Sequence, residues 1–148
     1  MTSAELDQDA TTDPGRLVDA LVQTSFAVQQ VLADAAAEHD LSLAQLRLLG
    51  ILRDRTAAMS ELARHLGLDR SSITGLVSRA ERRGLVRRTP SPDDGRGVLV
   101  ELTSEARGVG VALERDVGRG VVALAAGLGA AERDRLTALL ELLVERTY

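Results

Sequence analysis

A run of small, hydroxyl-bearing and arginine side chains between positions 70 and 82 has the chemistry of a surface that binds a polyanion. At helical spacing, one face would carry Arg70, Ser71, Thr74, Gly75, Ser78, Arg79 and Arg82. The side chains near its start are small, so the backbone could approach DNA base edges closely, while the later arginines suit phosphates. The alternative is an ordinary helical hairpin whose polar face is only solvated.

Two short helices joined by a tight turn, over about 60–83, would hold this face. We expect Ser60 to cap the first helix, Gly67 to end it in a left-handed conformation, and Asp69 to cap the second. The inward stripe of the second helix is apolar and consists of Ile73, Leu76, Val77 and Ala80. This arrangement is a helix-turn-helix, whose second helix has the shape to enter a DNA major groove.

A β-hairpin is predicted directly afterwards, with strands at 85–89 and 98–102 within a region spanning 85–102. The intervening residues 90–97 include two prolines, two aspartates and two glycines, which is typical of a loop. A two-stranded ribbon after a recognition helix forms a wing. Arg96 near its tip could enter the adjacent minor groove, where narrow segments attract arginine. A structural ion pair of Arg96 with Asp93 or Asp94 is the alternative.

Charge is distributed unevenly along the 148 residues. The formal net charge is −4, yet residues 47–97 contain 11 arginines and 6 acidic residues, a net of +5, so the remainder carries −9. Lysine is absent from the sequence, so all 18 of these basic residues are arginine. A basic middle between acidic ends suits a nucleic-acid partner better than the whole-chain charge suggests.

Several classes of function are disfavoured by residues that the chain lacks. Without cysteine there is no disulfide, thiol sensor or thiolate metal site. His39 and His65 fall on different predicted helices, so we expect no metal site and no cofactor. Phosphate-loop and serine-elbow motifs are missing, so we do not expect an enzyme. With no long apolar run and an acidic start, we expect a cytoplasmic protein without a membrane partner.

Long amphipathic segments flank the basic middle. We expect helices over 14–39, 43–54, 104–126 and 130–146, a connector over 55–59, and a flexible acidic arm over 1–12. The helix over 43–54 is apolar nearly all round and should sit centrally. A lobe spanning 43–103 is too small to cover the other apolar stripes. We therefore expect 13–40 and 104–148 to be dimerisation helices in a single domain over 13–148. Intramolecular three-helix packing is the alternative.

Four glycines lie inside the helix predicted over 104–126: Gly108, Gly110, Gly118 and Gly120. Each costs about 0.5–1 kcal/mol relative to alanine in a helix. Either they permit close backbone packing or they loosen the helix, and the sequence leaves both open.

Several motifs resemble those of the MarR family of bacterial transcription regulators. Residues 60–68 with 72–74 look like the family's helix-turn-helix, and 76–88 look like its exit into the wing. The wing signature Asp-x-Arg-x5-Leu-Thr is matched by Asp94, Arg96, Leu102 and Thr103. The resemblance implies a mainly α winged helix-turn-helix domain with a two-stranded β wing, flanked by long N- and C-terminal dimerisation helices.

The resemblance also implies which residues meet DNA. By position, Ser71, Ser72, Thr74, Ser78 and Arg79 would approach bases or nearby phosphates. Arg70 and Arg82 would contact the backbone, and Arg96 would reach the minor groove, braced by Asp94. The implied protein is a homodimer on a palindromic operator of double-stranded DNA, usually a repressor released by a small ligand.

The expected effector is anionic or phenolic, and its binding residues are unknown from the sequence. The lack of cysteine excludes the peroxide-sensing branch of the family. Phe26 and Tyr148 are the only aromatic residues, so a pocket would be aliphatic. Arg47, Arg53 or Arg55 could hold an anion there, although DNA-backbone or solvent contact is the alternative for all three. The competing function is a winged-helix protein-interaction module without specific DNA binding.

Overall fold

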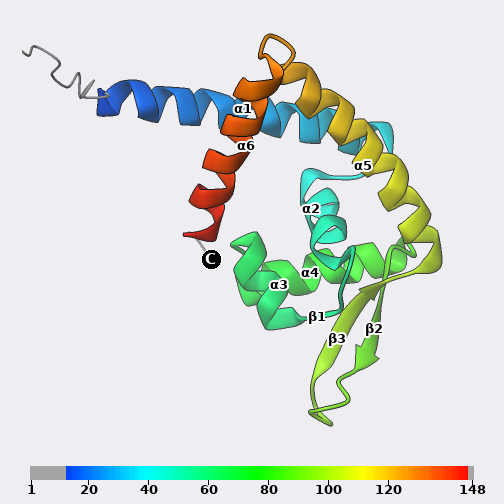
Figure 1. The fold of residues 1–148 in the computed structure, drawn as a ribbon. Coiled ribbons are helices and arrows are strands. Elements are labelled where there is room, and N and C mark those ends of the chain that lie inside the picture. The colour runs from blue at the N-terminus through cyan, green and yellow to red at the C-terminus, as the bar shows by residue number, and fades with distance from the viewer. Residues whose placement is uncertain (1–12, 147–148) are drawn as a thin grey trace, which may run out of the picture.

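The computed structural model describes residues 13–146 as a mainly helical fold with a small antiparallel sheet (Figure 1). The acidic arm predicted over 1–12, like Tyr148, lies outside the described residues. The elements are, in order, α1 (Pro14–Glu38), α2 (Leu43–Leu52), β1 (Ala57–Ala58), α3 (Met59–Leu66), α4 (Arg70–Arg82), β2 (Val86–Pro90), β3 (Val98–Leu102), α5 (Ser104–Leu124) and α6 (Ala130–Glu145). The predicted winged-helix class is confirmed, with one more strand than expected.

Side-chain caps begin four of the helices. Asp13 caps α1, and Ser42 with Gln45 forms a capping box at α2. Asp69 caps α4, and Thr103 caps α5. Each cap accepts a hydrogen bond from a backbone N–H that has no partner inside its helix, so these four helix starts are decided locally.

Two glycines in the left-handed region set the directions of α4 and β2. Gly67 ends α3 with φ of 65°, and Gly84 follows α4 with φ of 71°. In both turns the residue after the glycine donates its N–H to a carbonyl five residues earlier, at 2.9 Å. This pattern closes the last helical turn, and glycine adopts it without the Cβ penalty of other residues.

The start of α3 corrects the prediction. Ala57 and Ala58 are not a simple connector, because they form β1 and pair with β3, giving the strand order β1-β3-β2. The chain passes from β1 directly into the helix at Met59. Ala58 therefore occupies the N-cap position without a side-chain bond, and Ser60 lies inside the first turn. The pairing joins segments far apart in sequence, so no local pattern marks it.

Other boundaries differ from the prediction by one or two residues. Strand β2 begins at Val86, since Leu85 completes the turn after Gly84. Helices α2 and α5 each end two residues before the predicted 54 and 126. The two strands of the wing form the predicted hairpin and pair antiparallel, with Val86 opposite Leu102 and Pro90 opposite Val98.

Helix α2 lies at the centre of the core, as its apolar surface predicts (Figure 1). Its residues Leu48 and Leu52 are almost fully buried. The other large side chains with less than 2% exposure come from α3, α4 and the sheet: Leu62, Ile73, Val77, Val86 and Val100. Each such burial contributes about 1.5–3 kcal/mol. The result is a compact lobe that holds α4 and the hairpin in place.

Both ends of the described chain leave large apolar side chains uncovered. Helix α6 contains no buried residue, and its five leucines are 40–57% exposed: Leu136, Leu139, Leu140, Leu142 and Leu143. The first half of α1 exposes Leu17, Val18, Leu21, Val22 and Phe26 by 44–64%. Intramolecular three-helix packing is therefore not formed within residues 13–146. None of the helices described is long and apolar enough to cross a bilayer.

Helix α5 approaches α1 at a glycine. A Cβ added to Gly120 would collide with Cγ1 of Val31, whereas one added to Gly118 would meet nothing within 4 Å. Gly108 and Gly110 likewise face open space in the single chain. Of the two alternatives that the sequence left open, close packing thus applies to Gly120.

We expect Gly120→Ala to lower the free energy of unfolding by about 1–3 kcal/mol, because Val31 must shift to admit the new methyl group. Gly118→Ala is the matched control and should raise stability by up to about 1 kcal/mol through helix propensity. Urea unfolding of both variants measures this difference. Equal stability of the two variants would contradict the close packing, and Val31→Ala should recover part of the loss in Gly120→Ala.

Candidate nucleic-acid interface

Helix α4 turns one side to the core and the other to solvent. Its predicted inward stripe, Ile73 with Leu76, Val77 and Ala80, is buried. Six of the nine predicted site residues lie on the exposed side: Arg70, Ser71, Ser72, Thr74, Arg79 and Arg82. The fold therefore gathers most of the predicted site on one surface of a single helix.

Asp69 organises the first turn of α4. Its carboxylate accepts hydrogen bonds from the Ser72 N–H (2.8 Å), the Ser71 hydroxyl (2.8 Å) and the Ser72 hydroxyl (3.0 Å). These bonds, led by that of the Ser72 backbone, lower the pKa of Asp69 below its ordinary value. Each hydroxyl spends its only proton on Asp69, so both serines present acceptor lone pairs outward.

A shallow hollow lies next to these serines. It has a volume of about 300 Å³ and is lined in part by Ser71, Ser72, Gly75 and Arg79. The Arg79 guanidinium lies over Gly75, because a Cβ added there would be 3.1 Å from Nη1 of Arg79. Small residues thus leave room for a ligand edge beside a cationic group.

Ser78 has a different environment from the rest of the predicted face. It is half-buried, and its hydroxyl accepts a hydrogen bond from Nη2 of Arg88 on β2 at 3.0 Å. Its side chain thus has a partner inside the protein. The sequence placed Ser78 on the groove-facing side by spacing alone, and spacing does not show that a strand folds back against that part of α4.

The seven arginines from α4 to the wing loop fall into two groups. Three are held within the protein: Arg83 by Asp40 and Gln45, Arg87 by Glu101, and Arg88 by Glu81 and Ser78. Within residues 13–146, the guanidinium groups of the other four have no hydrogen-bond or ion-pair partner, and these are Arg70, Arg79, Arg82 and Arg96. The second group consists of the four arginines that the sequence assigned to the site.

Asp94 shapes the wing loop through the backbone. Its side chain accepts a hydrogen bond from the Arg96 N–H at 3.1 Å, and its carbonyl accepts from the Gly97 N–H at 2.9 Å. The ion pair between Arg96 and Asp93 or Asp94 is not formed, so the Arg96 guanidinium extends freely from the loop. Asp94 braces Arg96 as the resemblance implied, but through the amide. Figure 1 shows the hairpin projecting beyond the helices.

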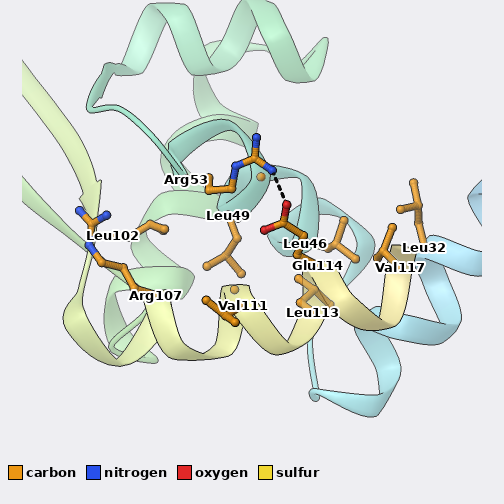
Figure 2. A pocket seen from close by; sticks show the side chains of 12 residues that line it. Leu32, Leu46, Leu49, Arg53, Leu102, Arg107, Val111, Leu113, Glu114 and Val117 are labelled. Carbon is orange, nitrogen blue, oxygen red and sulfur yellow. Dashed lines mark hydrogen bonds and ion pairs between the residues drawn. The ribbon is translucent and has the colours of Figure 1, made fainter. Parts of the chain in front are cut away.

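A second feature is an apolar pocket of about 380 Å³ between α2 and α5, closed on one side by Leu32 of α1 (Figure 2). Seven aliphatic side chains line it: Leu32, Leu46, Leu49, Leu102, Val111, Leu113 and Val117. Its polar lining side chains are Arg53, Arg107 and Glu114. Figure 2 shows Arg107 at one end of the pocket and Arg53 bonded to Glu114 beside it. Aliphatic walls are as expected from the scarcity of aromatic residues.

The three arginines suggested for an anion have separate environments. Arg53 lines the pocket and pairs with Asp54 and Glu114, which raises its pKa above the ordinary value, with Asp54 contributing most. Arg55 pairs with Glu61 on α3, and Arg47 is exposed and is not part of the lining. Arg107, which sequence analysis missed, has no side-chain partner within residues 13–146. Its spacing of three and four residues from Gly110 and Val111 was the available signal.

The loop between α1 and α2 contacts both α4 and α5. His39 Nε2 lies 2.9 Å from Asp116 Oδ2, and this bond is the main cause of the lowered pKa of Asp116. Arg83 Nη1 donates to the Asp40 carbonyl at 2.5 Å and to Oε1 of Gln45 at 3.0 Å. Sequence spacing does not reveal this role of Arg83, because its partners Asp40 and Gln45 lie about forty residues away. Across residues 13–146, no three His, Asp or Glu side chains are grouped to hold a metal ion.

Comparison with known proteins points to one family. A sequence model described as MarR family matches residues 39–97. The HTH-type transcriptional repressor NicR from Pseudomonas putida is 35% identical over 69% of this chain and 65% of its own length. The homoprotocatechuate degradative operon repressor from Escherichia coli is 29% identical over 84% of this chain and 85% of its own. For three of the curated relatives, the chain spans only 43%, 65% and 61% of their length.

A solved structure extends the similarity to the whole fold. A mutant MarR from Escherichia coli, crystallised with operator DNA, has a TM-score of 0.70 and 28% identity, covering 93% of this chain and 99% of that one. The relatives are transcriptional regulators and not enzymes. The matched segment, residues 39–97, contains α4, the four unpaired arginines, β2 and the wing loop. The chain belongs to the MarR family of winged helix-turn-helix transcriptional regulators.

Proposed function

We propose that this protein is a homodimeric, sequence-specific DNA-binding regulator that represses transcription from a palindromic operator. The observation that carries the proposal is the exposed side of α4 and the adjacent wing, where four guanidinium groups have no partner in the described chain. The similar MarR structure with operator DNA supports it. Unpaired arginines on a recognition helix and wing suit phosphates, guanine edges and a narrow minor groove.

The roles follow from where each side chain lies. Ser71 and Ser72 present acceptors, which suit the amino groups of cytosine and adenine in the major groove. Thr74 and Arg79 lie further along the same exposed side, where they meet base edges or nearby phosphates. Arg70 at the start of α4 and Arg82 at its end contact the phosphate backbone of the DNA. Ser78 is included in the DNA-binding site only because its neighbours on α4 belong to that site, since its own hydroxyl is bonded to Arg88.

Dimerisation is proposed from the uncovered apolar surfaces of α1 and α6. Their exposed leucines, valines and phenylalanine are gathered on two long helices, and such apolar surfaces mark protein–protein interaction sites. A second copy covers them in a two-fold arrangement, with segments 13–40 and 104–148 as dimerisation helices and 43–103 as the DNA-binding lobe. Two lobes related in this way read a palindrome whose half-sites lie about 34 Å apart.

Selection from a random duplex library at near-physiological salt, followed by sequencing, tests the proposal. Recovery of a two-fold symmetric site with half-sites about one helical turn apart would support it. Binding without any recovered sequence, lost steeply as salt rises, would overturn sequence-specific regulation. That outcome would favour the alternative, a winged-helix module that binds a protein partner.

Arg96→Ala should reduce operator affinity by about tenfold to a hundredfold without unfolding the protein. The Arg96 side chain is exposed and unpaired, so its removal breaks no internal contact. Fluorescence anisotropy with the selected operator measures the effect, and the circular dichroism melting curve checks the fold. Unchanged affinity would remove Arg96 from the minor groove.

The effector is proposed to be a small anion with an apolar body. The aliphatic pocket between α2 and α5 accommodates such a body, and Arg107 at its end offers an unpaired guanidinium. The pocket contains residues of α1, α2 and α5, so a ligand there would contact both the dimerisation helices and the DNA-binding lobe. A ligand that binds more tightly when the two lobes are spaced wrongly for the operator would weaken operator binding.

Benzoate and short-chain carboxylates, screened for a rise in Tm, test the pocket directly. We expect a hit to raise Tm in the wild type and to lose most of that shift in Arg107→Gln. Arg47→Gln is the matched control, since Arg47 is exposed and outside the lining. An equal shift in wild type and Arg107→Gln would remove Arg107 from ligand binding.

A further inference from the structure

We propose that Glu81 and Arg88 are positioning residues that set the angle between α4 and the wing, and so decide where Arg96 meets DNA. This inference rests on the proposed DNA-binding function. It assigns a role to two residues that present no free charge to DNA. The pair joins the last turn of α4 to the third residue of β2, across the turn at Gly84.

Glu81 holds both the side chain and the backbone of Arg88. Its Oε2 pairs with Nη1 of Arg88, and its Oε1 accepts from the Arg88 N–H at 3.3 Å. Nη2 of Arg88 donates in addition to the Ser78 hydroxyl, one helical turn earlier on α4, at 3.0 Å. The Glu81 and Arg88 side chains are 39% and 30% exposed. Several contacts from one helix thus fix one strand residue in both position and orientation.

Besides this pair, the turn is held by the Leu85 N–H bond to the Ala80 carbonyl at 2.9 Å and by the burial of Leu85 and Val86. Gly84 has φ of 71° and lacks a side chain, so it can change direction at low cost. On the opposite side of the turn, the Thr103 hydroxyl donates to the Gly84 carbonyl at 2.6 Å and anchors the end of β3. The clamp formed by Glu81, Arg88 and Ser78 is the corresponding anchor for β2. With both in place, the hairpin leaves α4 at one angle.

The wing magnifies any change at this anchor. From Arg88 the hairpin continues through Pro90 to the loop that contains Arg96. At about 3.3 Å per residue, the tip lies about 20 Å beyond the clamp, so a rotation of about 10° moves it by about 3 Å. A hydrogen bond does not tolerate such a shift. A loosened clamp therefore removes the minor-groove contact of Arg96 while α4 keeps its place on the core.

The chain provides a matched control in the same hairpin. Arg87 on β2 pairs with Glu101 on β3, with Nε 2.6 Å from Oε1, and the two residues are register partners. This ion pair joins strand to strand and has no bond to α4. Glu101→Gln thus removes a carboxylate of the wing, with the same change of charge as Glu81→Gln, without touching the helix–wing anchor.

The first test combines two footprints on the operator: hydroxyl radicals report protection of the deoxyribose in the minor groove, and dimethyl sulfate reports protection of guanine N7 in the major groove. We expect Glu81→Gln and Arg88→Lys to lose protection of the minor groove under the wing and about tenfold in affinity, with the major-groove contacts of α4 retained. Glu101→Gln should keep the wild-type pattern. Wild-type protection in both clamp variants, or an equal loss in Glu101→Gln, would overturn the proposal. A variant that merely unfolds would lose the major-groove contacts as well.

The second test needs no DNA. Because the chain has no cysteine, spin labels can be placed at Thr74→Cys on α4 and Gly95→Cys in the wing loop. Labelled protein is diluted with unlabelled chain, so that each assembly holds one labelled pair. Glu81→Gln should broaden or shift the helix–wing distance distribution, and Glu101→Gln should not. Identical distributions in Glu81→Gln and wild type overturn the clamp. If no operator is found, the proposed function fails, and this measurement still decides the clamp.

Discussion

Thr74→Glu is expected to reduce operator affinity by about a hundredfold or more while leaving the fold intact. Thr74 lies at the middle of the exposed side of α4, and its hydroxyl bonds only to the Arg70 carbonyl of its own helix. Glutamate forms helices well, so the substitution does not endanger α4. Its carboxylate would face bases and phosphates in a site where like charges repel and water is excluded.

Electrophoretic mobility shifts and anisotropy with the selected operator measure the loss of binding. Ser104→Glu is the matched control, because Ser104 is exposed at the start of α5, where a carboxylate favours the helix N-terminus. Both variants add one negative charge to the whole protein. Comparable losses in the two would mean that net charge, and not the α4 surface, governs binding. Retained affinity in Thr74→Glu would show that another surface contacts DNA.

Leu139→Asp is expected to dissociate the dimer and to lower operator affinity by about a hundredfold or more. Leu139 is 51% exposed in the single chain, on a helix without any buried residue. If a second copy covers it, a carboxylate there loses its water without gaining a partner, which costs several kcal/mol. A monomer also loses the avidity of two linked lobes, which is worth about 100-fold or more.

Sedimentation equilibrium over a range of concentrations measures the dissociation. Thr137→Asp is the matched control, because at about 100° per residue Thr137 lies about 160° around α6 from Leu139. It adds the same charge to the same helix on the opposite side. An intact dimer in Leu139→Asp would place the interface elsewhere. Equal dissociation in both variants would mean that α6 itself had unfolded.

Local patterns were sufficient for most of the secondary structure. Helix caps at Asp13, Ser42, Asp69 and Thr103, and glycine stops at positions 67 and 84, act within a few residues of themselves. The strand β1 could not be predicted in this way, because Ala57 and Ala58 become a strand only by pairing with β3. The neighbours of Ser60 in sequence suit a helix start, so Ser60 was predicted as a cap. The pairing of Ala57 and Ala58 with β3 instead places the start of the helix at Met59.

The residues of the candidate interface likewise fall into those that local sequence predicts and those that depend on contacts between distant segments. Exposure of Arg70, Arg79 and Arg82 follows from the helical period, because the apolar stripe decides which side faces the core. The sequence did not show that Arg83, Arg87 and Arg88 are held within the protein, since their partners lie on other elements. The sequence pattern alone does not distinguish the seven arginines between positions 70 and 96. Only the fold separates those available to DNA from those that hold the lobe together.

The order of residues was enough to specify the helix-turn-helix, the wing, the basic middle and the uncovered apolar stripes, because periodicity, caps and turn residues act over short distances. Tertiary structure alone decided that Gly120 is the glycine of α5 that contacts α1 and that Arg107 lines a pocket. It also decided that Ser78 and Glu81 bond to Arg88. Each of these depends on the distance between side chains that are separated in sequence but packed together. That distance is determined when the whole core closes around α2.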